Sequence, residues 1–220
     1  MDVRQIRHAT ILLPSNDPDQ RTRADQPPAR GDITDLHVHG ADWSRLQATE
    51  RRISGCHLTN VSLAQAHLED ARVTNTRFTD CDLASARWTN LKLDRCAFSG
   101  TRLTGLHTTG ITLTDVVFEH CRLDYATLTG LHATGSLAFL DCTLREATIE
   151  DSRLDGAVFA DCPMPQTQLA RTTMRGADLR GSGLTGLAGA ACLAGAIIEG
   201  SQIPQLTEAF LADLDIKVEP

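Results

Sequence analysis

The chain has 220 residues, of which 41% are hydrophobic, and a formal net charge of -7. This composition predicts one soluble domain, and its acidic balance argues against direct binding of nucleic acid. No stretch approaches the roughly 20 apolar residues of a membrane span, and charged residues interrupt residues 1–13, so we expect no secretory signal. We therefore expect a cytoplasmic protein without membrane contact.

The first 30 residues differ in composition from the rest. A short strand is expected at residues 9–13, before the stretch PSNDPDQRTRADQPPAR at residues 14–30, which holds four prolines and many charges. Such a stretch is typical of a linker. We therefore divide the chain into an N-terminal segment with a flexible linker at 1–30, a repeat domain at 31–203 and a C-terminal segment at 204–220.

A large apolar residue recurs at nearly every fifth position from Ile33 to Ile203. The stretch FTDCDLASARWTNLKLDRCAF at residues 78–98 shows this period clearly. An amphipathic helix repeats near 3.6 residues and a strand near 2, so neither regular element holds a period of five. The period shifts twice, through one inserted residue near 134–137 and one deleted residue within 185–190.

A second column, of small residues, lies two positions before the large ones. Six of the seven cysteines fall in it, as Cys81 and Cys121 do. In a reducing compartment we expect them to be buried free thiols that behave as small hydrophobic residues. The positions after each large residue are mostly Thr, Ser, Asp, Asn and Gly, which favour turns.

A unit of this kind resembles the pentapeptide-repeat family, whose consensus is close to A-D/N-L-x-x. Matching pentads include ADLRG at 177–181, SRLDG at 152–156 and ATLTG at 126–130. The resemblance implies an all-β fold, a right-handed quadrilateral β-helix in which each pentad forms one side of a square. About eight coils are expected. Phenylalanines one coil apart predict a stacked ladder of Phe78, Phe98, Phe118, Phe139 and Phe159.

The C-terminal segment changes period. In PQLTEAFLADL, which starts at residue 204, Leu206, Phe210 and Leu214 recur at four-residue steps, the spacing of one helix face. We expect a helical cap over the last coil, because an open coil exposes unpaired strand edges. A homodimer contact is the alternative, since some members of the resembled family pair end to end through this region.

Sequence motifs for chemistry are lacking. His37 and His39 flank an inward-facing residue without metal-ligand spacing, and the glycines follow no phosphate-loop pattern. We expect no catalytic residues, no metal site and no cofactor, and therefore no enzymatic activity.

Acidic residues concentrate in the middle of the repeats. Residues 111–170 hold nine Asp and Glu against three Arg, a local net charge of -6. We select a belt of partner-binding candidates that also includes one earlier acid: Asp80, Glu119, Asp124, Asp141, Glu150, Asp151, Asp155 and Asp161.

Two functions fit this belt. Some members of the resembled family mimic duplex DNA, bind type II topoisomerases such as DNA gyrase, and protect them from fluoroquinolones and other poisons. By that resemblance, the first hypothesis is a non-enzymatic DNA mimic that binds and modulates a type II topoisomerase and confers antibiotic resistance. The second is a rigid scaffold that mediates protein-protein interaction with an unrelated partner.

Overall fold

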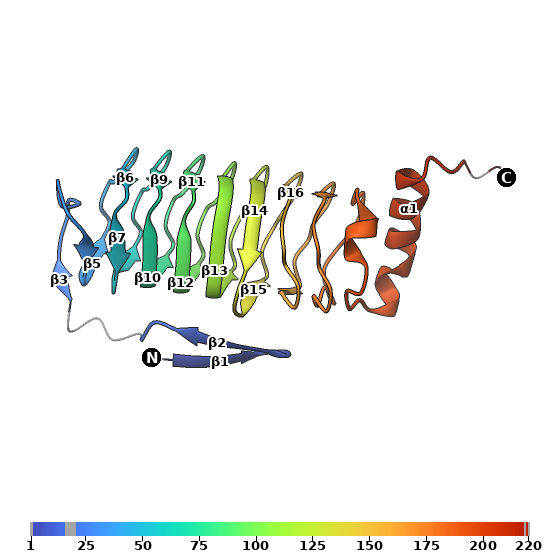
Figure 1. Cartoon of the computed structure of the whole chain (residues 1–220), viewed down its shortest axis with the longest axis horizontal. Helices are drawn as coiled ribbons and strands as arrows, with labels where there is room; N and C mark the ends of the chain where they lie inside the picture. The colour runs from blue at the N-terminus through green and yellow to red at the C-terminus, as the bar shows by residue number, and fades with distance from the viewer. Residues whose placement is uncertain (1, 16–20, 218, 220) are drawn as a thin grey trace.

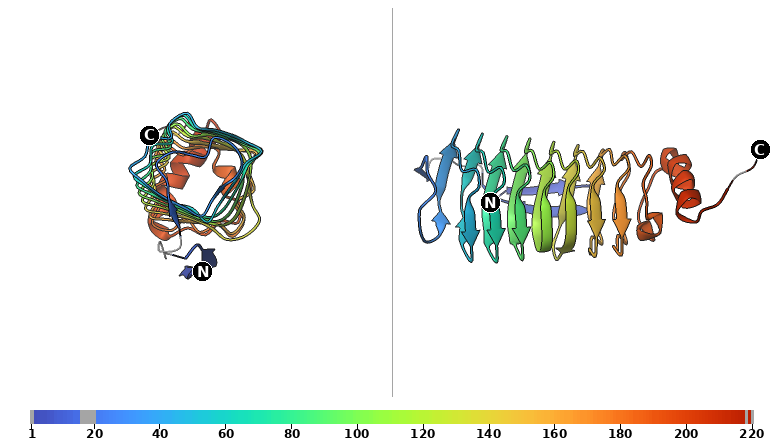
Figure 2. Two further views of the ribbon diagram at one scale, coloured as in Figure 1. Left: turned by 90° about the vertical axis from the view of Figure 1, so that its left-hand side faces the viewer. Right: turned by 90° about the horizontal axis from the view of Figure 1, so that it is seen from above.

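The chain forms a rod of stacked coils with a helix at one end and a hairpin along one side (Figure 1). The computed structural model describes residues 2–15, 21–217 and 219. Seen down the rod, the backbone of the coils superimposes as a square outline (Figure 2). The predicted all-β solenoid of square coils with a C-terminal helix is confirmed. Within the described residues, no helix is both long and apolar enough to span a membrane.

Each pentad forms one side of the square because of a fixed pattern of side-chain direction. The large apolar residue points inward, as Leu93 and Leu103 do at no more than 2% exposure, and its two neighbours point outward. The residue two positions later adopts a left-handed conformation at nearly every corner, with φ of 52° at Asp80 and 49° at Asn90. Gly, Asn and Asp tolerate this conformation best, which explains their frequency there.

We number the four faces by the inward column of one coil: Leu93 for face 1, Phe98 for face 2, Leu103 for face 3 and Thr108 for face 4. Parallel strands pair in register along the rod on faces 1, 2 and 4, often continuing around a corner. Face 3 is held by isolated bridges such as Asp82↔Arg102. The coil strands are β3 (Thr22–Arg23), β4 (Ile33–Thr34), β5 (Leu36–His39), β6 (Gln47–Thr49), β7 (Arg52–Ser54), β8 (His57–Thr59), β9 (His67–Glu69), β10 (Arg72–Thr79), β11 (Arg87–Thr89), β12 (Lys92–Ser99), β13 (His107–Glu119), β14 (Thr127–Ala133), β15 (Leu137–Leu140), β16 (Thr148–Glu150), β17 (Val158–Ala160) and β18 (Gln168–Ala170).

The predicted phenylalanine ladder stacks inside face 2. Successive ring centroids lie 4.6 to 4.8 Å apart, and the planes of adjacent rings differ by 2° to 12°. This distance matches the usual spacing of neighbouring strands, so each ring lies directly over the next. The ladder therefore fixes the register of the coils.

The cysteine prediction is also confirmed. All seven cysteines are free thiols, and the six in the small column are buried. Burial raises the pKa of Cys81 to about 11 and that of Cys96 to about 12. The Cys81 and Cys96 thiols therefore stay protonated near neutral pH and act as core packing.

The inserted residue lies at a corner of the coil, where it disturbs no core position. Leu113 pairs with Ala133, whereas Val116 pairs with Leu137, so the extra residue falls between 133 and 137 as expected. The deletion falls after Ala188, which still bridges Gln168 twenty residues earlier, and before Ile197, which bridges Asp178 nineteen residues earlier. Beyond that point the strand gives way to the 3-10 helix η1 (Ala190–Leu193).

The N-terminal segment forms an antiparallel hairpin of β1 (Asp2–Ile6) and β2 (Ala9–Leu13). The expected strand at residues 9–13 is present, and β1 is an addition. The hairpin runs along the rod across several coils, so its strands cross the coil strands (Figure 1). It buries Ile6, Ala9, Ile11 and Leu13 against outward-facing apolar residues of face 2, which are Ala97, Val117, Ala138, Leu140, Val158 and Ala160.

The coil begins earlier than the expected boundary at residue 31. Strand β3 pairs in parallel with β5, and the indole Nε1 of Trp43 donates a hydrogen bond to the Asp25 carbonyl at 3.0 Å. Part of the expected flexible linker is therefore ordered against the first coil. Residues 16–20 of that linker lie outside the described residues.

The C-terminal end is closed by the 3-10 helix η2 (Gly200–Gln202) and by α1 (Ile203–Asp213). The Asp213 carboxylate accepts hydrogen bonds from the backbone N–H groups of Gly189 and Ala190 at 2.9 and 2.6 Å. The Gln205 side chain accepts another from Leu184 N–H at 2.6 Å. These contacts satisfy polar groups of the last coil, as a cap must.

Candidate interaction surface

Three acids of the belt line one corner of the rod. Asp80, Asp141 and Asp161 all occupy the left-handed position between faces 2 and 3, with φ of 52°, 50° and 56°. We call these three side chains the acidic corner. Asp141 and Asp161 lie on adjacent coils, about 4.8 Å apart along the rod. All three are exposed, so their carboxylates face solvent.

The acidic corner has few cationic neighbours. Among the described residues, the imidazole of His120 lies beside it, with Nδ1 3.8 Å from Asp141 Oδ2. The same column holds Gly100 and Gly181 on the coils that follow Asp80 and Asp161. A Cβ at either glycine would collide with the preceding carboxylate, so glycine makes room for it.

Asp124 lies on face 3, beyond the acidic corner along the chain. Its carboxylate accepts a hydrogen bond from the backbone N–H of Arg145 at 3.0 Å. It is half-buried and therefore supports the backbone of the next coil.

Glu119 lies on face 2, one residue before the corner, and is partly covered by the hairpin. Its two carboxylate oxygens accept hydrogen bonds from Arg4 Nη1 and Nη2, both at 2.8 Å. The pKa of Glu119 is lowered, chiefly by this hydrogen bonding. Its charge is therefore largely neutralised within the chain.

The remaining acids of the belt lie on other sides of the rod. Glu150 on face 4 and Asp151 at the next corner both pair with Arg171, with N···O distances of 3.2 and 2.6 Å. Asp155 on face 1 accepts hydrogen bonds from Thr173 Oγ1 at 3.1 Å and from the backbone N–H of Arg175 at 2.7 Å. The structure thus divides the belt among four faces and brings together only Asp141 and Asp161, since Gly100 and His120 separate Asp80 from them along the corner.

The family model for the pentapeptide repeat region matches residues 51–128. The chain contains a pentapeptide-repeat region. The coil continues with the same geometry on both sides of the matched residues. A search of curated proteins finds no significant match.

Several solved structures resemble this chain. A trypsin-treated form of QnrB1, a plasmid-mediated fluoroquinolone resistance protein, is 17% identical with a TM-score of 0.42, over 86% of this chain and 100% of that chain. Full-length QnrB1 is 16% identical with a TM-score of 0.38, and the match covers 82% of this chain and 99% of that chain. The third structure is HetL from the cyanobacterium Nostoc, a pentapeptide repeat protein involved in heterocyst differentiation regulation. It is 15% identical with a TM-score of 0.37, and the match covers 77% of this chain and 84% of that chain. Similarities of this size transfer neither partner nor activity.

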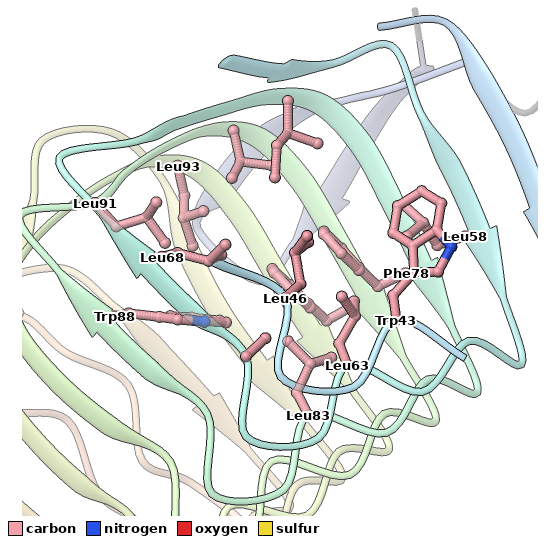
Figure 3. Close-up of a pocket in the computed structure, with 14 residues that line it drawn as sticks. Trp43, Leu46, Leu58, Leu63, Leu68, Phe78, Leu83, Trp88, Leu91 and Leu93 are labelled. Carbon is pink, nitrogen blue, oxygen red and sulfur yellow. The ribbon is translucent and has the colours of Figure 1, made fainter. Parts of the chain in front are cut away.

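The interior of the repeat region offers no room for a ligand. An apolar cavity of about 20 Å³ lies between the coils, lined by Trp43, Trp88 and surrounding leucines (Figure 3). A cavity of this size holds at most one water, and a water needs polar partners. Over the described residues, no three His, Cys, Asp or Glu side chains converge as metal ligands.

Helix α1 divides the three residues predicted for a cap or a dimer. Leu206 packs against the core of the last coil, beside the buried Ala209. Phe210 and Leu214 instead face outward, with 44% and 67% of their surface exposed, and Ile203 joins them at 57%. The helix therefore combines an inner capping side with an outer apolar side.

Sequence reasoning missed the cations that the hairpin places on face 2. Besides Arg4, Arg7 pairs with the fully buried carboxylate of Asp178, and its Nη2 donates to the Arg180 carbonyl at 2.8 Å. The signal was present in the outward column of face 2, where Ala97 and Val117 stand in place of polar residues. Apolar side chains on an outer surface mark a covered surface.

Proposed function

We propose that the chain is a non-enzymatic interaction protein whose acidic corner binds the cationic DNA-binding surface of a type II topoisomerase in place of DNA. The observation that carries this proposal is the pair Asp141 and Asp161. These exposed carboxylates repeat at the coil spacing on a rigid support. The imidazole of His120 lies beside Asp141, on one side of the pair.

The charge of the acidic corner is more than a consequence of its backbone conformation. The left-handed position requires a tolerant residue, and the same column also contains the uncharged Asn60 and Gly100. Two carboxylates about 5 Å apart repel each other by about 1 kcal/mol in water. Asparagine would satisfy the turn without that repulsion, so the aspartates are better explained by attraction to a cationic partner.

Duplex DNA carries one charge per roughly 1.7 Å of its axis, and a protein groove built to hold it is lined by Lys and Arg. The acidic corner presents a shorter and sparser array than DNA does. We therefore propose contact along part of a topoisomerase groove, with Asp124 on the adjoining face as a further contact. The resemblance of the pentad pattern to topoisomerase-binding family members selects this partner for the first test.

The test is a supercoiling assay with purified DNA gyrase, with and without a fluoroquinolone. We expect the wild-type chain either to inhibit supercoiling or to protect it from the drug, and the double variant Asp141→Asn/Asp161→Asn to lose most of this effect. Asparagine keeps the tolerance of the left-handed conformation, so the variant should fold normally.

The control is Asp70→Asn, which makes one Asp-to-Asn change at the diagonally opposite corner, where Asp70 also has a left-handed φ of 51°, and is compared with each of the single variants Asp141→Asn and Asp161→Asn as well as with the double variant. This control should retain full effect. Absence of any effect of the wild-type chain at micromolar concentration would reject the topoisomerase proposal. Equal loss in both variants would show that the effect depends on overall charge and not on the acidic corner.

A further inference from the structure

The hairpin has two outer edges, and its register shows which backbone groups lie on each. The two-residue turn Arg7-His8 makes Ile6 and Ala9 a hydrogen-bonded pair, and hydrogen-bonded and open pairs then alternate along the strands. The open pairs are Val3↔Leu12 and Gln5↔Thr10. The N–H and C=O groups of these four residues therefore point away from the hairpin.

The outer edge of β2 is held by the rod. Ser136 Oγ donates a hydrogen bond to the Thr10 carbonyl at 2.7 Å, and the Leu12 N–H donates to the Asp115 carboxylate. Ser136 lies beside the inserted residue of the corner between faces 1 and 2. This edge of the hairpin is therefore closed by side chains of the coil.

The outer edge of β1 is open. Among the described residues, the outward N–H and C=O groups of Val3 and Gln5 have no protein partner. Proteins usually protect such an edge with lysine, proline or a bulge. Here the two outward positions are a valine that is 67% exposed and a neutral glutamine. The outward-facing side chains of β1 therefore leave its edge accessible to another strand, while its charged residues Asp2 and Arg4 are engaged with the rod.

The open edge runs beside the acidic corner. Arg4 in the middle of β1 reaches Glu119, one residue before the corner position of that coil, while Asp2 pairs with Arg77 at 3.0 Å, nearer the start of the rod. At the other end, Arg7 reaches Asp178. The strand thus spans the coils that carry the acidic corner. A further strand, about 4.8 Å beyond β1, would lie over that corner.

We propose that the outer edge of β1 binds an extended basic peptide segment of another protein as a third strand of the hairpin sheet. Backbone hydrogen bonds to Val3 and Gln5 supply pairing, the usual basis of strand addition. Alternate side chains of the added strand point toward the rod, where Lys or Arg pairs with Asp141 and Asp161. The intervening side chains pack beside Val3 and suit β-branched residues. This proposal does not depend on a topoisomerase as partner.

The test is fluorescence anisotropy of a labelled peptide that alternates Lys and Val over about seven residues, a usual strand length, with the full chain. We expect saturable binding that weakens at least about tenfold when every second amide of the peptide is N-methylated, because methylation removes its N–H donors. Val3→Pro should weaken binding to a similar extent. It removes an outward N–H that takes no part in the β1–β2 pairing, a position where an edge strand tolerates proline.

Three further variants separate the two parts of the surface. Val3→Thr keeps the N–H and should bind as wild type does, whereas Asp141→Asn/Asp161→Asn should weaken binding about fivefold through loss of exposed ion pairs. Asp70→Asn should have no effect. Hydrogen exchange of the Ile11 amide confirms that the hairpin remains docked in each variant.

Three outcomes would overturn the proposal. One is no binding at millimolar peptide. Another is binding that neither N-methylation nor Val3→Pro affects, since the peptide would then be held by charge alone. The third is a dimer of the chain that Val3→Pro dissociates, which would make a second copy the occupant of the edge.

Discussion

Arg4 and Glu119 form a two-pronged ion pair, 115 residues apart in sequence, that fastens the hairpin to face 2 of the rod. The pair is partly exposed, with 41% and 26% of the two side chains accessible, so its contribution to docking is about 0.5 to 1 kcal/mol. We predict that Glu119→Gln raises hydrogen exchange of the Ile11 amide by about two- to fivefold. The double variant Arg4→Ala/Glu119→Gln should raise the exchange rate of the Ile11 amide little further than Glu119→Gln alone. Additive effects of the two changes would mean that the residues act independently.

The apolar contact beneath the hairpin contributes more than the ion pair. Ile11 is fully buried, whereas its neighbour Leu12 is 37% exposed. Ile11→Ala removes buried volume and should cost about 2 to 4 kcal/mol of docking free energy. The hairpin should then become sensitive to trypsin at Arg7 while the rod keeps its far-UV circular dichroism spectrum. Leu12→Ala is the matched control, and comparable trypsin sensitivity in both variants would contradict the packing described.

Acid should loosen two of the hairpin's ion pairs, Arg4–Glu119 and Arg7–Asp178, in sequence. Hydrogen bonding by Arg4 holds the pKa of Glu119 below its ordinary value of 4.5, so its stabilising contribution is complete above pH 4.5 and is lost as the pH falls. Asp178 keeps a pKa of about 2, chiefly through Arg180, so its pair with Arg7 persists to lower pH. NMR titration of the two arginine side chains should therefore show Arg4 released first.

The contribution of Asp115 to stability changes with pH in the direction opposite to that of Glu119. Burial raises its pKa, so its contribution is greatest at low pH and is lost as the pH rises through the raised value. Protonation of Asp115 should thus offset part of the loss at Glu119. In the variant Glu119→Gln, the acid transition of the Arg4 side chain in the NMR titration should disappear. Its persistence would assign the transition to another group.

The phenylalanine ladder should dominate the stability of the coil. Phe118 is 4% exposed and stacks between Phe98 and Phe139 at 4.7 and 4.8 Å. Phe118→Ala should cost about 3 to 5 kcal/mol of unfolding free energy, measured by chemical denaturation. Phe118→Leu should recover more than half of this loss, because the cavity is then smaller. A loss below 1 kcal/mol for the alanine variant would contradict the role of the ladder.

The outer side of α1 should pair two chains if the predicted homodimer forms there. Ile203, Phe210 and Leu214 are all exposed by at least 44%. We predict a concentration-dependent dimer in analytical ultracentrifugation that Phe210→Ser/Leu214→Ser abolishes without lowering thermal stability. Leu206→Ser should lower stability instead, since this residue packs on the last coil. A monomer at high concentration would leave α1 with its capping role alone.

The coil could be predicted from sequence because each pentad repeats the same local choice of inward, outward and left-handed positions. Phe98, Cys96 and Asp80 all lie where the period of five puts them. The acidic belt was less predictable. Acids close in sequence, such as Glu150 and Asp155, lie on different faces because the chain turns a corner every five residues.

The hairpin could be predicted only in part. Alternation in ATILL indicates a strand at residues 9–13, but no period links Arg4 to Glu119 or Arg7 to Asp178. Such contacts depend on where the linker returns the chain. Similarly, the four-residue spacing of Leu206, Phe210 and Leu214 predicts a helix, but it does not show that the inner side is taken by Leu206 and Ala209.

A stack of coils is mechanically a row of separate links, because each coil contacts only its neighbours and unravelling can begin at either end. The hairpin changes this, because it contacts coils from Arg77 to Asp178 at once. The hairpin therefore bridges these coils along the rod. Separation of two adjacent coils beneath the hairpin would require the hairpin to detach as well. The spanned coils should therefore unfold as one cooperative unit, while the coils before Arg77 unfold independently of it.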